Sequence, residues 1–171
     1  MRGMATITLG GELVHLVGEL PAVGSPAPAF TVTGSDMSDV SLSDYAGKRV
    51  ILNIFPSLDT DTCARSVREF NKRAASLDNT VVLCISADLP FAAGRFCTVE
   101  GIKNVTTGST FRSNFGVDYG VRMKDGALAG LNARSVVIVD SEGKVAYTQL
   151  VPETHDEPDY EAVFDALESV K

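Results

Sequence analysis

The sequence lacks the features of a membrane-spanning or nucleic-acid-binding protein. Tryptophan is absent, and no apolar run approaches the roughly 18 consecutive residues that a transmembrane helix needs. Only 15 lysine and arginine residues stand against 22 aspartate and glutamate residues, which gives a formal net charge of -7. Such a surface repels phosphate backbones and anionic lipid headgroups. We therefore expect neither nucleic acid nor a membrane among the partners.

Cysteine is also scarce, and the odd number of three argues against the paired disulfide framework of a small secreted protein. No apolar segment of the secretory type follows Arg2, and Met4 is an alternative start that would make residues 1–3 an extension. The expected location is the cytoplasm, with reduced thiols of which one or more are reactive. A chain of 171 residues can bury its own core, so we expect one domain over residues 1–171.

Several familiar site motifs are missing. There is no Cys-x-x-Cys pair, which disfavours a disulfide reductase, and no glycine-rich phosphate-binding motif follows a predicted strand. The two histidines, His15 and His155, stand alone without the spacing of metal ligands. The acidic segment 153–159 is most simply a solvated loop. The sequence thus predicts no bound cofactor and no metal.

Hydrophobic patterning predicts an α/β protein that begins with a β-hairpin. Residues 5–17 form two alternating segments around Gly10-Gly11, a dipeptide suited to a two-residue turn. Further strands are predicted at residues 29–33, 49–55, 80–87, 135–140 and 144–151, and helices at residues 61–77, 90–100 and 160–170. Asp88 is the expected N-cap of the second helix, and residues 103–132 are expected to be mainly loop with a short helix near 110–115. A βαβ unit followed by a ββα unit is the order of a thioredoxin-like sheet with helices on both faces.

Cys63 lies where the chain leaves a buried strand and enters a helix. Pro56 ends the preceding strand, and helix 61–77 begins after a run of capping residues, so Cys63 falls in its first turn. Unpaired N–H groups and the positive end of the helix dipole favour a thiolate at such a position. Asp59 and Asp61 oppose it, so a nearby cation is needed. The alternative is a small apolar side chain that fills the core-facing side of the helix.

The spacing Pro56-x-x-x-Thr60-x-x-Cys63 matches the peroxidatic-cysteine motif of the peroxiredoxins. The wider sequence resembles the thiol peroxidase subfamily, which are atypical two-cysteine peroxiredoxins, and the likeness covers essentially the whole chain. The segments that carry it are Asn53-Ile-Phe-Pro-Ser, Asp59-Thr, Ser66-Val-Arg68, Leu83-Cys-Ile-Ser-Ala-Asp-Leu-Pro-Phe91, Arg95-Phe-Cys97 and Glu157-Pro-Asp-Tyr160. The motif becomes specific in combination with Arg-Phe-Cys on the following helix.

The resemblance implies a role for each residue of the motif. Cys63 would be the nucleophile that attacks a hydroperoxide and becomes a sulfenic acid. Thr60 would orient the peroxide and hydrogen-bond the thiolate, and Pro56 would wall the pocket against water. The family's arginine maps onto Arg134, where a fixed cation stabilises the thiolate and the developing negative charge. From the sequence alone, an arginine that leads into a strand is more often a solvated edge residue.

The two remaining cysteines have different settings. Cys84 lies in a buried strand, where a thiol usually behaves as an inert small hydrophobe. For Cys97, the residues alone suggest simple helix packing, whereas the resemblance implies the resolving cysteine that forms a disulfide with Cys63. The subgroup that places its resolving cysteine five residues after the nucleophile is excluded, because that position is Arg68.

The expected function is a thiol-dependent peroxidase for hydrogen peroxide and organic hydroperoxides. The resemblance implies thioredoxin as the reductant and a homodimer as the assembly. Two alternatives stay open: a non-enzymatic redox sensor that uses the same disulfide as a switch, and a one-cysteine peroxidase in which Cys97 is structural. Cysteines on separate packed helices usually exceed the roughly 7 Å Cα limit for a bridge. Disulfide formation is therefore expected to require local unwinding of one or both helices.

Overall fold

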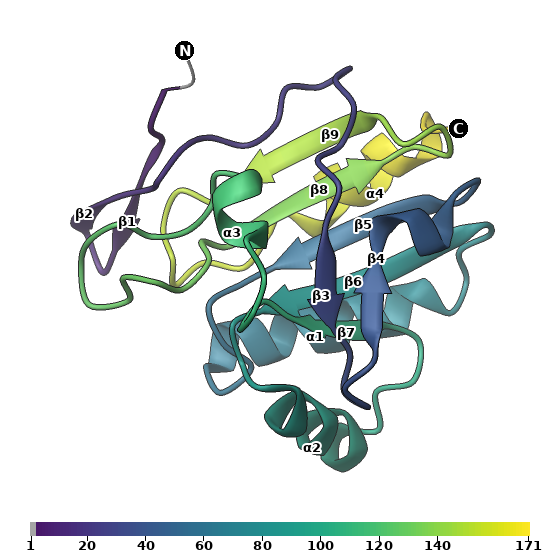
Figure 1. Cartoon of the computed structure of the whole chain (residues 1–171), viewed down its shortest axis with the longest axis horizontal. Coiled ribbons are helices and arrows are strands. Elements are labelled where there is room, and N and C mark those ends of the chain that lie inside the picture. The colour runs from purple at the N-terminus through teal and green to yellow at the C-terminus, as the bar shows by residue number, and fades with distance from the viewer. Residues whose placement is uncertain (1–2) are drawn as a thin grey trace.

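The computed structural model describes residues 3–171, which form a short hairpin and a larger sheet covered by helices (Figure 1). The strands are β1 (Thr6–Leu9), β2 (Glu12–His15), β3 (Thr31–Thr33), β4 (Asp39–Ser41), β5 (Arg49–Ile54), β6 (Thr80–Ser86), β7 (Thr106–Ser109), β8 (Ser135–Val139) and β9 (Val145–Leu150). The helices are the short 3-10 helix η1 (Leu42–Tyr45), α1 (Asp61–Ala74), α2 (Pro90–Glu100), α3 (Phe115–Asp118) and α4 (Tyr160–Glu168). The predicted α/β class and the N-terminal hairpin are both present.

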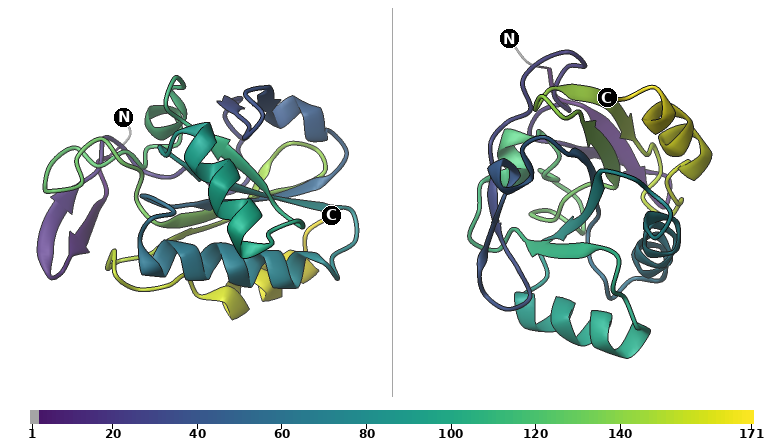
Figure 2. Two further views of the ribbon diagram at one scale, coloured as in Figure 1. Left: turned by 90° about the horizontal axis from the view of Figure 1, so that it is seen from below. Right: turned by 90° about the vertical axis from the view of Figure 1, so that its right-hand side faces the viewer.

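The large sheet has seven strands in the order β4-β3-β7-β6-β5-β8-β9. Strands β5, β6 and β7 run parallel, whereas β8 is antiparallel to β5. Helices α1 and α4 cover one face, and η1 with α3 covers the other (Figure 2). Helix α2 lies beyond β7, at the lower end of the molecule in Figure 1. The hairpin lies at the end of the molecule toward which β5 runs.

Two apolar clusters lie on the two sides of the sheet. The cluster under α1 and α4 contains Ile51, Val67 and Phe70, and it also holds Cys63 and Cys84. Helix α1 belongs there because its apolar residues recur every three or four positions and so share one face. The opposite cluster includes the inward side of the hairpin, which places the hairpin firmly against the body of the protein.

The expectation for residues 103–132 is wrong in part, because they contain strand β7 and the short helix α3 begins at Phe115. Strand β7, Thr-Thr-Gly-Ser, is polar and carries no apolar alternation, so no periodicity marks it. Its backbone is nevertheless paired with β6 and β3. Gly108 permits this close pairing, since a Cβ there would lie 2.5 Å from Val32. The polar strand β4 was likewise not predicted.

The predicted cap of the second helix is also wrong. Leu89, not Asp88, occupies the N-cap position of α2. The Asp88 carboxylate instead accepts hydrogen bonds from the Ser57 hydroxyl at 2.6 Å, the Leu58 amide at 2.8 Å and the Ser86 hydroxyl at 2.6 Å. Asp88 therefore joins the end of β6 to the loop that leads into α1.

Candidate functional site

Cys63 lies in the first turn of α1, as the sequence predicts. Thr60 is the N-cap of this helix and Asp61 its first residue, so Cys63 is the third. Backbone N–H groups in this turn have no earlier helical carbonyl to bind. The Cys63 side chain has 0% exposure and contributes to the apolar cluster beneath α1. Its sulfur is thus removed from bulk water and depends on protein groups for stabilisation of charge.

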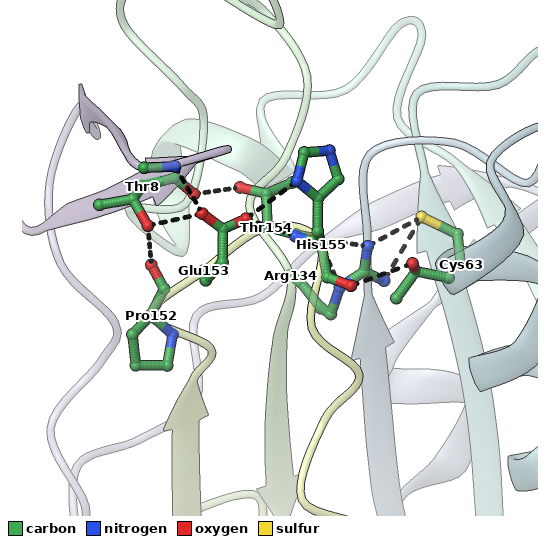
Figure 3. A network of polar contacts seen from close by, with 9 residues as sticks. Thr8, Cys63, Arg134, Pro152, Glu153, Thr154 and His155 are labelled. Carbon is green, nitrogen blue, oxygen red and sulfur yellow. Dashed lines mark hydrogen bonds and ion pairs between the residues drawn. The ribbon is translucent and has the colours of Figure 1, made fainter.

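The guanidinium of Arg134 faces this sulfur directly (Figure 3). Its two terminal nitrogens each lie 3.4 Å from Cys63 Sγ. Nε and one terminal nitrogen also donate to the Thr154 carbonyl, at 3.3 and 2.9 Å. Arg134 is only 2% exposed, so the reading of this residue as a solvated strand edge is wrong. The charged group that directly faces the Cys63 sulfur is therefore a buried planar cation.

Sheet topology explains how two residues 71 positions apart come together. Strand β8 is antiparallel to β5, with Ser135 opposite Ile54. Arg134 immediately precedes β8 and therefore arrives where β5 ends. The chain turns there into α1, whose first turn holds Cys63. The carboxyl end of β5 is thus the point at which the Cys63 sulfur and the Arg134 guanidinium meet.

A small pocket of about 210 Å³ opens beside this pair. It is lined by Leu9, Pro56, Thr60, Thr62, Leu128, Arg134, Thr154 and His155. Pro56 is buried in its wall, at the position that the sequence analysis expects. The Thr60 side chain lines the pocket, but its hydroxyl donates to the Ser57 carbonyl at 3.0 Å. In this state the Thr60 hydrogen is therefore used within the turn and not on the Cys63 sulfur.

The sequence does not predict that residues 152–155 belong to the site. The segment reads as the start of a solvated acidic loop, yet Thr154 is only 4% exposed and holds Arg134 through its carbonyl. The next carbonyl, that of His155, accepts a hydrogen bond from the Thr62 hydroxyl at 3.2 Å. Carbonyl groups carry no sequence signal, so only the positions of the partners could have revealed them.

Cys84 is buried on β6, in the same apolar cluster as Cys63. Burial raises the pKa of the Cys84 thiol to about 12. The Asn53 side-chain amide, 3.7 Å from the sulfur, opposes this rise only partly. A thiol in this environment stays protonated at physiological pH.

Cys97 occupies the second half of α2 and is partly exposed. It lines a surface pocket of about 360 Å³ together with the turn 34–38 and Thr107. Burial raises the pKa of Cys97, and a hydrogen bond with Thr107 opposes that rise. All three cysteines are free, and both helices α1 and α2 are intact in this state.

Residues 3–171 contain neither a metal-binding cluster nor a membrane-spanning helix. No cluster of three or more histidine, cysteine, aspartate or glutamate side chains there could hold a metal ion. None of the helices in that range is long and apolar enough to cross a membrane.

The chain is similar in sequence and in fold to several known proteins. Residues 22–164 match the Redoxin family. The thiol peroxidase of Mycobacterium tuberculosis is 58% identical over 164 residues, covering 96% of this chain and 99% of the relative. The thiol peroxidase of Corynebacterium glutamicum is 54% identical over 164 residues, and this match also covers 96% of this chain and 99% of the relative. The crystal structure of a peroxiredoxin-like protein from Aquifex aeolicus superimposes with a TM-score of 0.92 at 41% identity, covering 96% of this chain and 97% of that one. These matches confirm the thioredoxin-like fold with its N-terminal hairpin. The chain therefore belongs to the Redoxin family and, within it, to the thiol peroxidases of the peroxiredoxin type.

Proposed function

We propose that this peroxidase reduces hydrogen peroxide and organic hydroperoxides with Cys63 as the nucleophile. The Cys63 thiolate attacks the distal peroxide oxygen, the O–O bond breaks, and the leaving oxygen takes up a proton as water or alcohol. Sulfur is thereby oxidised by two electrons to the sulfenic acid. The observation that supports this best is the pair of Arg134 nitrogens, each 3.4 Å from the sulfur. The same guanidinium is placed to stabilise the charge that develops on the leaving oxygen.

The pocket supports the remaining assignments around the nucleophile. Pro56 is buried in its wall and limits water near the sulfur. Thr60 lies at the helix start, where a rotation of its hydroxyl would turn its hydrogen from Ser57 toward the thiolate or a bound peroxide. Leu9 and Leu128 add apolar surface on the remaining sides. We propose that the peroxide binds in this pocket, with its distal oxygen toward Cys63.

For the second step, we propose that Cys97 resolves the sulfenic acid. The Cys97 thiol attacks the Cys63 sulfur, a disulfide forms, and water leaves. The two cysteines lie on different intact helices, so the step requires local unwinding. Helix α2 is the element that we expect to open, because Cys97 lies in its last turn, directly before the cap at Gly101.

Reduction of this disulfide needs two electrons from outside the chain, and we propose thioredoxin as their source. The three free cysteines suit a reducing compartment, so the proposed cycle operates in the cytoplasm.

We propose that one domain spanning the chain carries both cysteines and acts within a homodimer. Phe91 is 70% exposed and suits such an interface, whereas Phe115 is fully buried and belongs to the core. Sedimentation of the wild type against Phe91→Ser tests the dimer.

The experiment that tests the function couples loss of peroxide to thioredoxin, thioredoxin reductase and NADPH, with hydrogen peroxide and cumene hydroperoxide in separate runs. Many equivalents consumed per chain support the proposed cycle. A single equivalent would instead indicate the redox sensor. Mass spectrometry of the oxidised monomer separates the one-cysteine alternative, because a Cys63–Cys97 disulfide lowers the mass by two hydrogens, whereas a sulfenic acid adds one oxygen.

A further inference from the structure

The carboxylate of Glu153 lies at the centre of a hydrogen-bond network between the N-terminal hairpin and the active site (Figure 3). One oxygen accepts from the Thr8 hydroxyl and the Gly11 amide, both at 2.9 Å. The other accepts from the His155 amide at 2.7 Å and lies 3.2 Å from the His155 ring nitrogen Nδ1. A side chain in a solvated loop would not accept two hydrogen bonds from a hairpin more than 140 residues away in the sequence. Glu153 is thus a structural link between the segment 152–155 and the hairpin.

Main-chain contacts complete the same link. The Thr8 amide donates to the Pro152 carbonyl, and the Thr154 amide and hydroxyl both donate to the Thr8 carbonyl, each at 2.8 Å. The peptide that follows is therefore fixed, and it carries the Thr154 carbonyl to which Arg134 donates twice. This chain of contacts runs from the Glu153 carboxylate at one end to the Cys63 sulfur at the other.

We propose that Glu153 is a positioning residue for the peroxidase reaction, which acts through the Thr154 carbonyl to hold the Arg134 guanidinium against Cys63. This inference rests on the proposed function, in which Cys63 is the nucleophile. Holding the segment 152–155 against the hairpin keeps the carbonyl at a fixed place, and a fixed carbonyl orients the planar guanidinium. Without the Glu153 contacts, the carbonyl and the guanidinium gain freedom, and the two nitrogens face the sulfur for less of the time.

The protonation state of Glu153 is consistent with this role. The His155 amide, followed by the Gly11 amide, holds the pKa of the Glu153 carboxyl at about 2. Its folded pKa lies below the ordinary value of about 4.3, so its stabilising contacts are complete above that pH and are lost as the pH falls through about 2. Glu153 is therefore a carboxylate throughout the range in which cysteine reactivity is measured.

The decisive property of this proposal is the sign of its effect. Removing a negative charge near a thiolate ordinarily favours the thiolate and shifts cysteine reactivity to lower pH. Loss of positioning has the opposite effect, because the stabilising cation is no longer held in place. Glu153→Gln keeps the size and one acceptor oxygen but sets an NH₂ group against the His155 amide or the hairpin donors. We expect this variant to move the pH midpoint of Cys63 alkylation upward and to slow peroxide reduction by roughly 3- to 10-fold.

The test is iodoacetamide alkylation of Cys63 in the reduced full-length protein, followed by mass spectrometry from pH 5 to 10. Glu142→Gln is the matched control, since it removes the same charge from an exposed turn away from the site. Thr8→Val is the second variant; it removes one hydroxyl donor, keeps the Thr8 main-chain contacts, and should move the midpoint in the same direction by less. Repeating Glu153→Gln in an Arg134→Ala background closes a double-mutant cycle.

An upward shift in the wild-type background that disappears in the Arg134→Ala background supports the proposal. A downward shift, an unchanged midpoint, or an equal shift in both backgrounds would overturn it. A fall in melting temperature with an unchanged midpoint would likewise reduce Glu153 to a structural contact. The alkylation readout does not depend on turnover, so failure here is distinct from failure of the assignment of Cys63 as nucleophile, which activity in Cys63→Ser would reveal.

Discussion

Cys63 and Cys84 are both fully buried thiols in the same apolar cluster, and they differ in the group beside the sulfur. Two guanidinium nitrogens of Arg134 face Cys63, whereas Cys84 has only the neutral amide of Asn53. Burial without a cation raises the pKa of Cys84 to about 12. This difference predicts that Cys84 is inert and that the fixed cation beside Cys63 allows a buried sulfur to serve as the proposed nucleophile.

Exchange of the nucleophile gives the largest expected effect. Cys63→Ser should reduce thioredoxin-coupled peroxidase activity to background, because a serine hydroxyl is not ionised at neutral pH and, within residues 3–171, neither remaining thiol faces a guanidinium. Steady-state NADPH oxidation measures it. Appreciable turnover in this variant would show that the comparison between the two buried thiols assigns the nucleophile wrongly.

Removal of the cation should make Cys63 resemble Cys84. Arg134→Ala is expected to slow peroxide reduction by about 10²- to 10³-fold, the usual effect of losing a preorganised charge stabiliser. The pH midpoint of Cys63 alkylation should rise, since Asp59 and Asp61 near the helix start remain to oppose the thiolate. Circular dichroism serves as the control for folding. A normal alkylation profile in a folded Arg134→Ala protein would remove Arg134 from the site.

Oxidation should loosen the helix start that carries Cys63 but not the strand that carries Cys84. If the Cys63–Cys97 disulfide requires unwinding, amide exchange in the oxidised protein should be faster over residues 58–66 and 92–101 than in the reduced protein. Exchange over β6, which carries Cys84, should be unchanged. Hydrogen-exchange mass spectrometry of both redox states gives the comparison. Equal protection in the two states would mean that the thiols already lie within bonding reach.

The smallest effect is expected at Cys84. Cys84→Ser should leave peroxidase activity within about twofold of the wild type and lower the free energy of unfolding by about 1 kcal/mol, a common cost of a core substitution. Native Cys84 should also resist alkylation up to about pH 10, since its pKa is about 12. Urea unfolding and the coupled assay test the variant. If it failed to form the disulfide, the division between core and resolving cysteine would be wrong.

The elements with strong hydrophobic patterns could be predicted from the sequence. The hairpin, strands β5, β6, β8 and β9, and helices α1 and α4 lie where their apolar patterns indicate, whereas α2 follows from its start and stop residues, Pro90 and Gly101. The hydrophobic pattern does not predict β7 and β4, because these strands are polar and are held by backbone pairing. Asp88 differs from its prediction for a related reason: a short acidic residue before a helix suits a cap, but here two donors from the loop 57–58 and the Ser86 hydroxyl bind its carboxylate.

The site divides in a similar way. The position of Cys63 at a helix start follows from local sequence, and Arg134 came from the likeness to a family. Neither source indicated the segment 152–155, since its contribution consists of carbonyl groups and of one carboxylate whose hairpin partners, Thr8 and Gly11, lie more than 140 residues away. Long-range register decides such contacts, and register is a property of the folded sheet and hairpin rather than of any short segment.

The Redoxin match begins at residue 22, after the hairpin formed by β1 and β2. Even so, Leu9 from this hairpin lines the pocket, and Thr8 binds both Glu153 and the Thr154 peptide. The residues that meet at the candidate site thus come from both parts of the chain: Cys63 and Arg134 from the matched region, and Thr8 and Leu9 from the hairpin outside it. A Redoxin core transplanted without its hairpin would keep Cys63 and Arg134 but lose one wall of the pocket. We expect substitutions in the hairpin to change the reactivity of Cys63 even where Cys63 and Arg134 stay the same.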